Sequence, residues 1–199
     1  MEDTYRTISG ESSGLYKEKG SKFLAFAYPV STEERVKDIL DELRGKYFDA
    51  RHHCYAYYLG ADRKRFRMND DGEPSSTGGK PIAGQILSND LTDILIVVVR
   101  YFGGVKLGVP GLINAYRTAA ADAIANAAIV ELTVKRTFGI EFDYSVMNSV
   151  MKIVKECAPE VLERRFENIC SMVVAIRESE AENLAVRLKQ VESLVLNEL

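Results

Sequence analysis

The first two-thirds of the chain combine strand-like and helix-like patterns of hydrophobic positions. Residues 22–30 predict one strand, and residues 53–59 predict another whose alternating side chains place aromatic rings on both faces. Between them, Ser31-x-x-Glu34 predicts a capping box for a helix that ends before Gly45. The apolar face of this helix consists of Val36, Ile39, Leu40 and Leu43.

A second hydrophobic run has no polar alternation. Residues 94–99 are all aliphatic, which predicts a strand buried on both faces. A glycine-rich loop follows, and then an alanine-rich helix from about Leu112 to Ala127, whose small residues allow close approach to a sheet. A further helix is expected from about Pro81, with Ser76 or Thr77 as its cap.

The last third of the chain predicts the element order βαββαβ. Its strands are residues 138–144, 161–167, 170–177 and 193–197. The first helix carries apolar residues at helical spacing up to Pro159, and a capping box, Ser179-x-x-Glu182, opens the second. This order is the ferredoxin-like motif, an antiparallel sheet with two helices on one face.

Composition divides the chain near residues 130–137. Thirteen of the 14 glycines precede Arg136. Up to and including Arg136 there are 19 basic and 18 acidic residues, whereas 7 basic and 11 acidic residues follow. We therefore predict an α/β (α+β) protein of two domains, residues 1–134 and 135–199, joined without a flexible linker.

Composition also limits the classes of function. The 199 residues carry a net charge of −3, so any nucleic-acid site must be a local patch. Three cysteines without a CxxC pair fall short of a disulfide framework or a four-ligand zinc site. The acidic start at residues 1–3 is unlike a secretory signal, and residues 94–99 are too few to span a bilayer. We expect a cytoplasmic protein without a membrane partner.

The glycine-rich loop is the first candidate site. Its glycines are Gly103, Gly104, Gly108 and Gly111. The basic residues in or beside it are Arg100, Lys106 and Arg117. Glycine torsions can expose backbone N–H groups, and the following helix N-terminus attracts anions, so the loop predicts a phosphate or oxyanion cradle. It has neither a P-loop nor a full GxGxxG spacing, so no nucleotide is specified. The alternative is a tight crossover whose glycines serve packing.

The second candidate site is the acidic turn of residues 69–80. Asp70, Asp71 and Glu73 supply oxygen ligands that suit Mg²⁺, held weakly and completed by a phosphate ligand. The favoured alternative is a solvated turn that caps the next helix. No other cofactor is predicted.

The third candidate site contains both histidines. His52 and His53 are neighbours on a predicted strand, so they point to opposite faces and cannot both ligate one ion without distortion. A nucleophilic pairing of His53 with Cys54 is poor for the same reason. One histidine can line a binding site as a hydrogen-bond donor, and a structural role is the alternative.

Basic and aromatic residues alternate in a way that suits single-stranded nucleic acid. Arg63, Lys64, Arg65 and Arg67 lie near Tyr55, Tyr57, Tyr58 and Phe66. We hypothesise that the fold brings this segment to one face with the second basic group. That group consists of Lys80, Arg100, Lys106 and Arg117. An exposed hairpin without a ligand is the alternative.

Three groups of motifs extend along the chain. They are Gly79-Lys80-Pro81-Ile82-Ala83-Gly84 leading to Val97-Val98-Val99-Arg100-Tyr101-Phe102-Gly103-Gly104-Val105-Lys106-Leu107-Gly108, then His52-His53-Cys54-Tyr55-Ala56, and Asp70-Asp71-Gly72-Glu73-Pro74. With them the chain resembles the Impact/YigZ family over essentially its full length. The resemblance implies an N-terminal domain like the second domain of ribosomal protein five of the small subunit, followed by a ferredoxin-like domain.

The resemblance also implies a function. The eukaryotic Impact protein regulates translation by competing for the activator of an initiation-factor kinase, and it carries an extra N-terminal interaction domain. This chain resembles the bacterial type, without that domain. We therefore expect a protein that binds RNA, the ribosome or a translation factor, with no catalytic residue assigned. The alternative is an enzyme or sensor whose glycine loop binds a phosphorylated metabolite or nucleotide with Mg²⁺.

Overall fold

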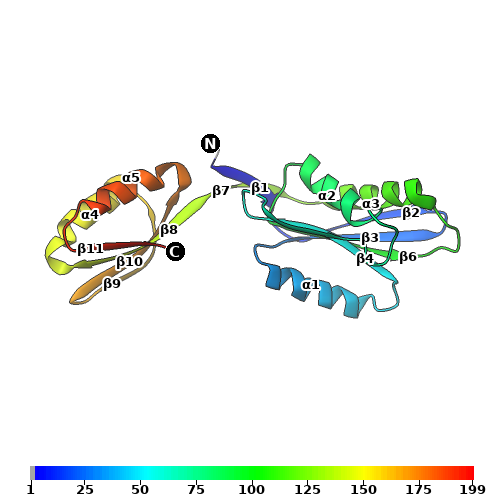
Figure 1. The fold of residues 1–199 in the computed structure, drawn as a ribbon, viewed down its shortest axis with the longest axis horizontal. Helices are drawn as coiled ribbons and strands as arrows, with labels where there is room; N and C mark the ends of the chain where they lie inside the picture. The colour runs from blue at the N-terminus through cyan, green and yellow to red at the C-terminus, as the bar shows by residue number, and fades with distance from the viewer. Residues whose placement is uncertain (1–2) are drawn as a thin grey trace. The chain divides into compact units, whose positions relative to one another are not determined.

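The computed structural model describes residues 3–199, so Met1 and Glu2, on which the expectation about a secretory signal partly rested, lie outside the described residues. The chain divides into two compact units (Figure 1). The N-terminal unit is Tyr5–Leu132, and the C-terminal unit joins residues 3–4 to Thr133–Leu199. Strand β1 (Thr4–Ile8) pairs with β7 (Ile129–Thr133) in a two-stranded sheet.

The N-terminal unit is built on one five-stranded sheet. In spatial order its strands are β2 (Ser12–Glu18), β3 (Ser21–Pro29), β6 (Ile94–Tyr101), β4 (His52–Leu59) and β5 (Arg65–Asn69). Every neighbouring pair is antiparallel. Residues 94–99 of the central strand β6 are all 0% exposed, which confirms the predicted strand with two buried faces.

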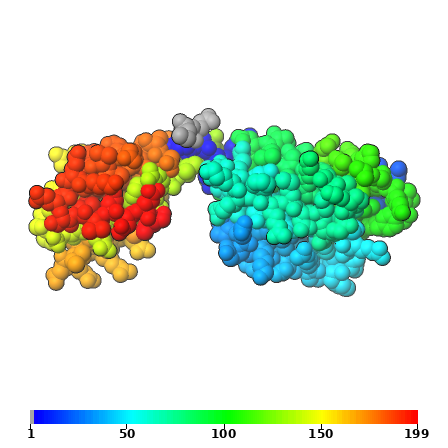
Figure 2. Space-filling view, in the orientation of Figure 1, coloured from blue at the N-terminus to red at the C-terminus, as the bar shows by residue number. Residues whose placement is uncertain are grey.

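Helices cover both faces of this sheet. Helix α1 (Glu33–Lys46) packs on one face, whereas α2 (Gly79–Ser88) and α3 (Gly108–Ala125) pack on the other (Figure 1). In the space-filling view, the blue atoms of α1 form a layer apart from the green atoms of α2 and α3 (Figure 2). Gly14 of β2 allows α3 to approach the sheet closely, because a Cβ there would lie 2.3 Å from the backbone nitrogen of Ala123.

Three predicted helix caps are wrong. Helix α1 is capped by Thr32 and not Ser31, because the Thr32 hydroxyl accepts from the backbone N–H of Arg35. Neither Ser76 nor Thr77 caps α2, whose preceding residue is Gly78. Helix α5 (Glu178–Lys189) begins one residue before Ser179. The Ser179 hydroxyl therefore lies inside the first turn and donates to Asp3 Oδ2 instead of capping.

The C-terminal unit has the predicted order of elements. They are β8 (Lys135–Asp143), a 3₁₀ turn at Tyr144–Val146, α4 (Met147–Cys157), β9 (Glu160–Phe166), β10 (Ile169–Arg177), α5 and β11 (Leu194–Glu198). The antiparallel sheet order β11-β8-β10-β9 confirms the ferredoxin-like fold and the mixed α/β class. Buried residues of β8 alternate and pack on the apolar faces of both helices.

No helix within residues 3–199 is both long enough and apolar enough to cross a membrane.

Candidate functional site

A buried ion pair lies at the centre of the candidate site. Arg100 is near the end of β6, where pairing opposite Phe23 directs its side chain to the face covered by α2 and α3. Its Nη1 donates to Glu73 Oε1 at 2.6 Å, and the two side chains are only 7% and 4% exposed. The Tyr116 hydroxyl on α3 donates to the same oxygen at 2.7 Å. Glu73 therefore connects the loop after β5 to the central strand and to α3.

Arg100 also keeps an unused donor. Its guanidinium carbon lies 5.5 Å from the ring centre of Phe23 and 5.6 Å from that of Phe102. Its buried Nε has no hydrogen-bond partner among residues 3–199. A buried donor without an acceptor costs free energy.

Arg100 lines a cleft of about 440 Å³ at the N-terminus of α3. The cleft brings together five residues that the sequence analysis singled out, namely His52, Glu73, Arg100, Lys106 and Gly108. Leu107, Gly108 and Val109 also line the cleft, so the N-terminus of α3, with the positive end of its dipole, lies there, and no side chain caps it. Glu73 and Pro74 form part of the wall, so the acidic loop and the glycine loop enclose one site.

The glycines of the loop have different tasks. A Cβ on Gly103 would lie 2.0 Å from the carbonyl carbon of Gly20, so Gly103 serves the packing of β6 against the β2–β3 turn. Its N–H donates to Ser21 Oγ at 3.1 Å. Gly104 and Gly108 instead adopt positive φ values of 89° and 73°, which glycine tolerates best. Packing accounts for Gly103, and backbone conformation accounts for the other two.

The three carboxylates predicted to hold Mg²⁺ do not converge. Asp70 Oδ1 accepts from the N–H groups of Gly78 and Gly79 at 2.9 and 2.8 Å, and Oδ2 accepts from Ser76 N–H at 2.8 Å. Asp71 Oδ2 accepts from the backbone N–H of His53, on strand β4. Glu73 is occupied by Arg100 and Tyr116.

The structure therefore gives the magnesium hypothesis no supporting geometry. Nowhere in the described part of the chain do three His, Cys, Asp or Glu side chains lie close enough together to hold a metal ion. The structure is closer to the alternative of a solvated turn that caps the next helix, since Pro74, Ser75 and Ser76 are exposed. The cap of α2 is, however, Asp70, through two N–H groups, and not Ser76 or Thr77.

The two histidines occupy opposite faces of β4, as the strand period requires. His52 Nδ1 donates to the Asp71 carbonyl oxygen at 2.8 Å, and the ring lines the α3 cleft. His53 is buried on the α1 side, and burial lowers its pKa, although the Asp71 carboxylate opposes this change. Burial raises the pKa of the Cys54 thiol, which donates to the Asp70 carbonyl oxygen. Cys54 therefore stays protonated and is a poor nucleophile.

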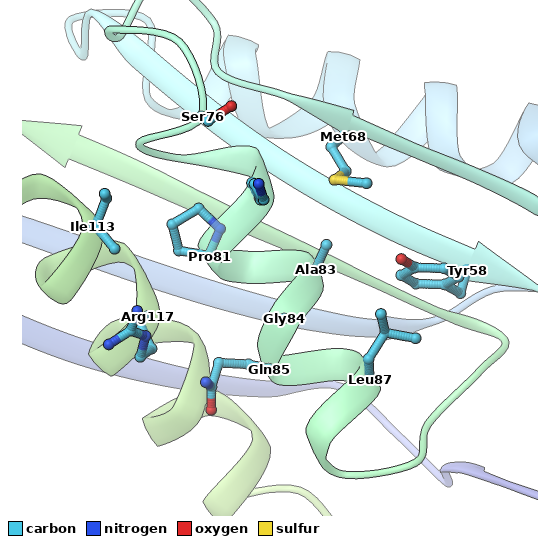
Figure 3. A pocket seen from close by; sticks show the side chains of 11 residues that line it. Tyr58, Met68, Ser76, Pro81, Ala83, Gly84, Gln85, Leu87, Ile113 and Arg117 are labelled. Atoms are coloured by element: carbon cyan, nitrogen blue, oxygen red, sulfur yellow. The ribbon is translucent and has the colours of Figure 1, made fainter. Parts of the chain in front are cut away.

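The two basic segments do not meet on one face, so that expectation is wrong. Pairing of Arg65 with Leu59 and of Arg67 with Tyr57 places both arginines on the α1 face of the sheet. Arg63 lies in the preceding turn and forms an ion pair with Asp90. The other basic segment lies on the α2 and α3 face. Lys80 and Arg117 line a second cleft there, of about 640 Å³ (Figure 3).

Some features of the site were missed by reasoning from the sequence. Glu73 was assigned to metal binding, although it is the partner of Arg100. Asp70 was not identified as the cap of α2. The acidic turn did contain the signal that a carboxylate can cap a helix starting several residues later, but only the folded loop shows which carboxylate does so.

Comparison with known proteins places these features in a family. The model of the Impact N-terminal domain matches residues 19–124. IMPACT family member YigZ of Escherichia coli (strain K12) is 27% identical over 172 residues, which cover 85% of this chain and 84% of that protein. An IMPACT family member of Haemophilus influenzae is 30% identical over 178 residues, covering 88% and 86%.

A third relative and a solved structure agree with this placement. IMPACT family member YvyE of Bacillus subtilis (strain 168) is 33% identical over 136 residues, and the match spans 68% of this chain but only 63% of that protein. The crystal structure of a hypothetical protein has the same fold, with a TM-score of 0.75 and 24% identity over 100% of this chain and 98% of the other. Since the family model matches more than half of the residues, the chain belongs to the Impact N-terminal domain family.

Proposed function

We propose that this protein binds RNA phosphate in the α3 cleft and acts in translation as an RNA-bound or ribosome-bound regulator. The observation that carries the proposal is the position of Arg100. Its guanidinium side chain lines the cleft beside the uncapped N-terminus of α3 and is held in place by Glu73. Phosphate oxygens accept strong hydrogen bonds from guanidinium groups and from the N–H groups at helix N-termini.

The charges around the cleft support an anionic ligand. Arg100 neutralises Glu73, the acidic residue of the lining. Arg51 and Lys106 also line the cleft and are exposed, and neither forms an ion pair with a carboxylate of residues 3–199. The helix dipole adds to this positive charge. A phosphate group in the cleft would therefore lie near Arg51, Lys106 and the N-terminus of α3.

Membership of the Impact family supports the link to translation, because the eukaryotic Impact protein regulates translation. The family resemblance does not specify the ligand of this chain. The role in translation is therefore inferred from the family, and the phosphate contact is inferred from the geometry of the cleft.

One observation favours a second candidate function, the binding of a small phosphorylated ligand. The cleft of about 440 Å³ lies within the size range of small-molecule sites, and two loops enclose it. The chemistry is the same phosphate recognition by Arg100, Lys106 and α3, but the ligand ends within the cleft. Extended RNA would continue beyond it.

The two functions are separated by fluorescence anisotropy with a single-stranded RNA of about twelve nucleotides, and by calorimetry with adenosine monophosphate and with inorganic phosphate. For RNA, affinity should fall with salt with a log–log slope of about −0.7 per phosphate contact. Lys106→Glu should weaken binding and make this slope less steep. Arg100→Lys keeps a positive charge beside Glu73 but removes the planar guanidinium, and it should weaken both RNA and phosphate binding.

Lys64→Glu is the matched control, because Lys64 is exposed and lies outside the cleft. The variant should bind like the wild-type protein. Stoichiometric binding of adenosine monophosphate without RNA binding would select the second function. A wild-type protein that binds none of the three probes at low salt would overturn both.

A further inference from the structure

Strand β5 forms one edge of the five-stranded sheet. It pairs with β4 on one side and with no other strand of the described chain on its outer side. The Asn69 end is covered by the backbone of Gly79, since a Cβ on that glycine would lie 2.6 Å from Asn69 N. Residues 65–68 are exposed. The open edge is therefore a short segment with unpaired backbone groups, which is a template for an added strand.

One face of this edge is apolar. Phe66 and Met68 are 51% and 40% exposed, and the Phe66 ring stacks on Tyr58 with ring centres 5.3 Å apart. Met68 and Tyr58 also line the cleft of about 640 Å³ that passes over α2, next to Leu87 (Figure 3). Side chains that extend from an added strand on this face would enter an apolar groove.

The other face of the edge is basic. Arg65 and Arg67 lie on the α1 face, and neither is within ion-pair distance of a carboxylate in residues 3–199. On the opposite face, Lys80 and Arg117 line the groove, and neither has an ion-pair partner in this range. Cationic and apolar residues thus alternate along β5, and the positive charges of Arg65 and Arg67 are not neutralised by carboxylates in residues 3–199.

We propose that β5 binds a partner protein by accepting an extended segment in which acidic and apolar residues alternate. The segment forms a sixth strand whose backbone pairs with residues 65–68. Its apolar side chains pack on Phe66, Met68 and Leu87, while its acidic side chains lie opposite Arg65 and Arg67. Main-chain hydrogen bonds supply affinity in this mode of binding, and the alternation of side chains supplies specificity.

Charge excludes a second copy of β5 as the occupant. In an antiparallel pair of two β5 strands, directly opposite residues share a face. A register that matches the two faces places arginine opposite arginine, which is repulsive. A register shifted by one residue places Arg65 or Arg67 opposite Phe66 or Met68 and loses the apolar contacts. An acidic and apolar segment satisfies both faces.

The test uses a fluorescein-labelled peptide of about seven residues with alternating glutamate and valine. The first control peptide has the same composition with all glutamates before all valines. The second has the alternating sequence with N-methyl groups on alternate peptide bonds, which removes main-chain donors but keeps the side chains. We expect the alternating peptide to bind with at least about tenfold higher affinity than either control, and to slow amide exchange at residues 65–68.

Protein variants locate the site independently. Arg65→Glu with Arg67→Glu should weaken the alternating peptide at least about tenfold, because two favourable pairs become repulsive. Lys152→Glu with Lys155→Glu reverses two exposed charges on α4 and should leave binding unchanged. Lys106→Glu should also leave it unchanged, so the result is distinguishable from binding at the α3 cleft.

Three results would overturn the proposal. One is equal affinity for all three peptides, which would show attraction by charge alone. Another is slowed amide exchange elsewhere in the protein but not at residues 65–68. The third is displacement of the peptide from β5 by a single-stranded RNA, which would identify the edge as a nucleic-acid surface.

Discussion

Arg100 and Glu73 form an ion pair of 2.6 Å in the wall of the α3 cleft, although they lie 27 positions apart in the chain. Because both side chains are almost fully buried, neither charge can be hydrated if its partner is removed. Tyr116 donates to the same Glu73 oxygen, so α3 depends on the pair as well. The pair thus connects the architecture of the N-terminal unit to the geometry of its cleft.

Breaking this pair should strongly destabilise the protein. Arg100→Leu or Glu73→Leu alone should lower the free energy of unfolding by about 3–5 kcal/mol, because each leaves an uncompensated buried charge. The double variant should be more stable than the two separate losses predict. Urea denaturation of the four proteins measures this coupling. Arg35→Ala removes an exposed pair with Glu42 and should cost less than about 1 kcal/mol. Additive losses at Arg100 and Glu73 would contradict the prediction.

Asp70 should contribute to stability as the cap of α2. Its carboxylate accepts three backbone N–H bonds, two of them at the start of the helix. Asp70→Ala should therefore cost about 1–2 kcal/mol, and Asp70→Asn should cost less because one acceptor oxygen remains. Thermal and urea unfolding provide the measurement. The exposed Asp38→Asn on α1 is the control, and an Asp70→Ala protein as stable as this control would rule out the capping role.

Stability should decrease as pH falls below about 6.5 because of His53. Burial lowers the pKa of His53 in the folded protein below its ordinary value of 6.5. Below this value the unfolded chain takes up a proton that the folded protein binds less readily. Protonation therefore stabilises the unfolded state more than the folded state. Above it, both states are neutral at this residue and the contribution is constant.

Urea midpoints measured from about pH 7.5 down to about pH 5.5 test this, since carboxylates with ordinary pKa values remain ionised over that range. His53→Gln should show a weaker dependence on pH than the wild-type protein. An unchanged dependence in this variant would assign the effect to other groups.

Two glycine substitutions should act in opposite directions. Gly103→Ala places a Cβ 2.0 Å from the carbonyl carbon of Gly20, so the β2–β3 turn must move, at a cost of about 2–3 kcal/mol. Gly84 lies inside α2, and a Cβ there meets nothing within 4 Å. Gly84→Ala should therefore stabilise the protein by about 0.5–1 kcal/mol through lower chain entropy. Calorimetric melting temperatures test both signs, and a stabilising Gly103→Ala would show that the close approach is dispensable.

The elements themselves are largely determined by local sequence. The six aliphatic residues from Ile94 to Val99 can all be buried only where both faces of a strand are covered. The structure places them at the centre of the sheet. The alternating residues of β8 and the helical spacing of α4 likewise predicted the ferredoxin-like unit. These patterns are local because strand and helix periods depend on neighbouring residues.

The partners of the charged residues were decided by the tertiary structure. Helix caps depend on which residue first turns into the helix, and a shift of one residue moved the cap from Ser31 to Thr32. Whether Glu73 binds a metal or Arg100 depends on where a loop closes over β6. The face that Arg65 occupies depends on its pairing with Leu59. Hydrophobic periodicity therefore determined the elements, whereas long-range contacts, which no local pattern encodes, determined the chemistry of the cleft and of the sheet edge.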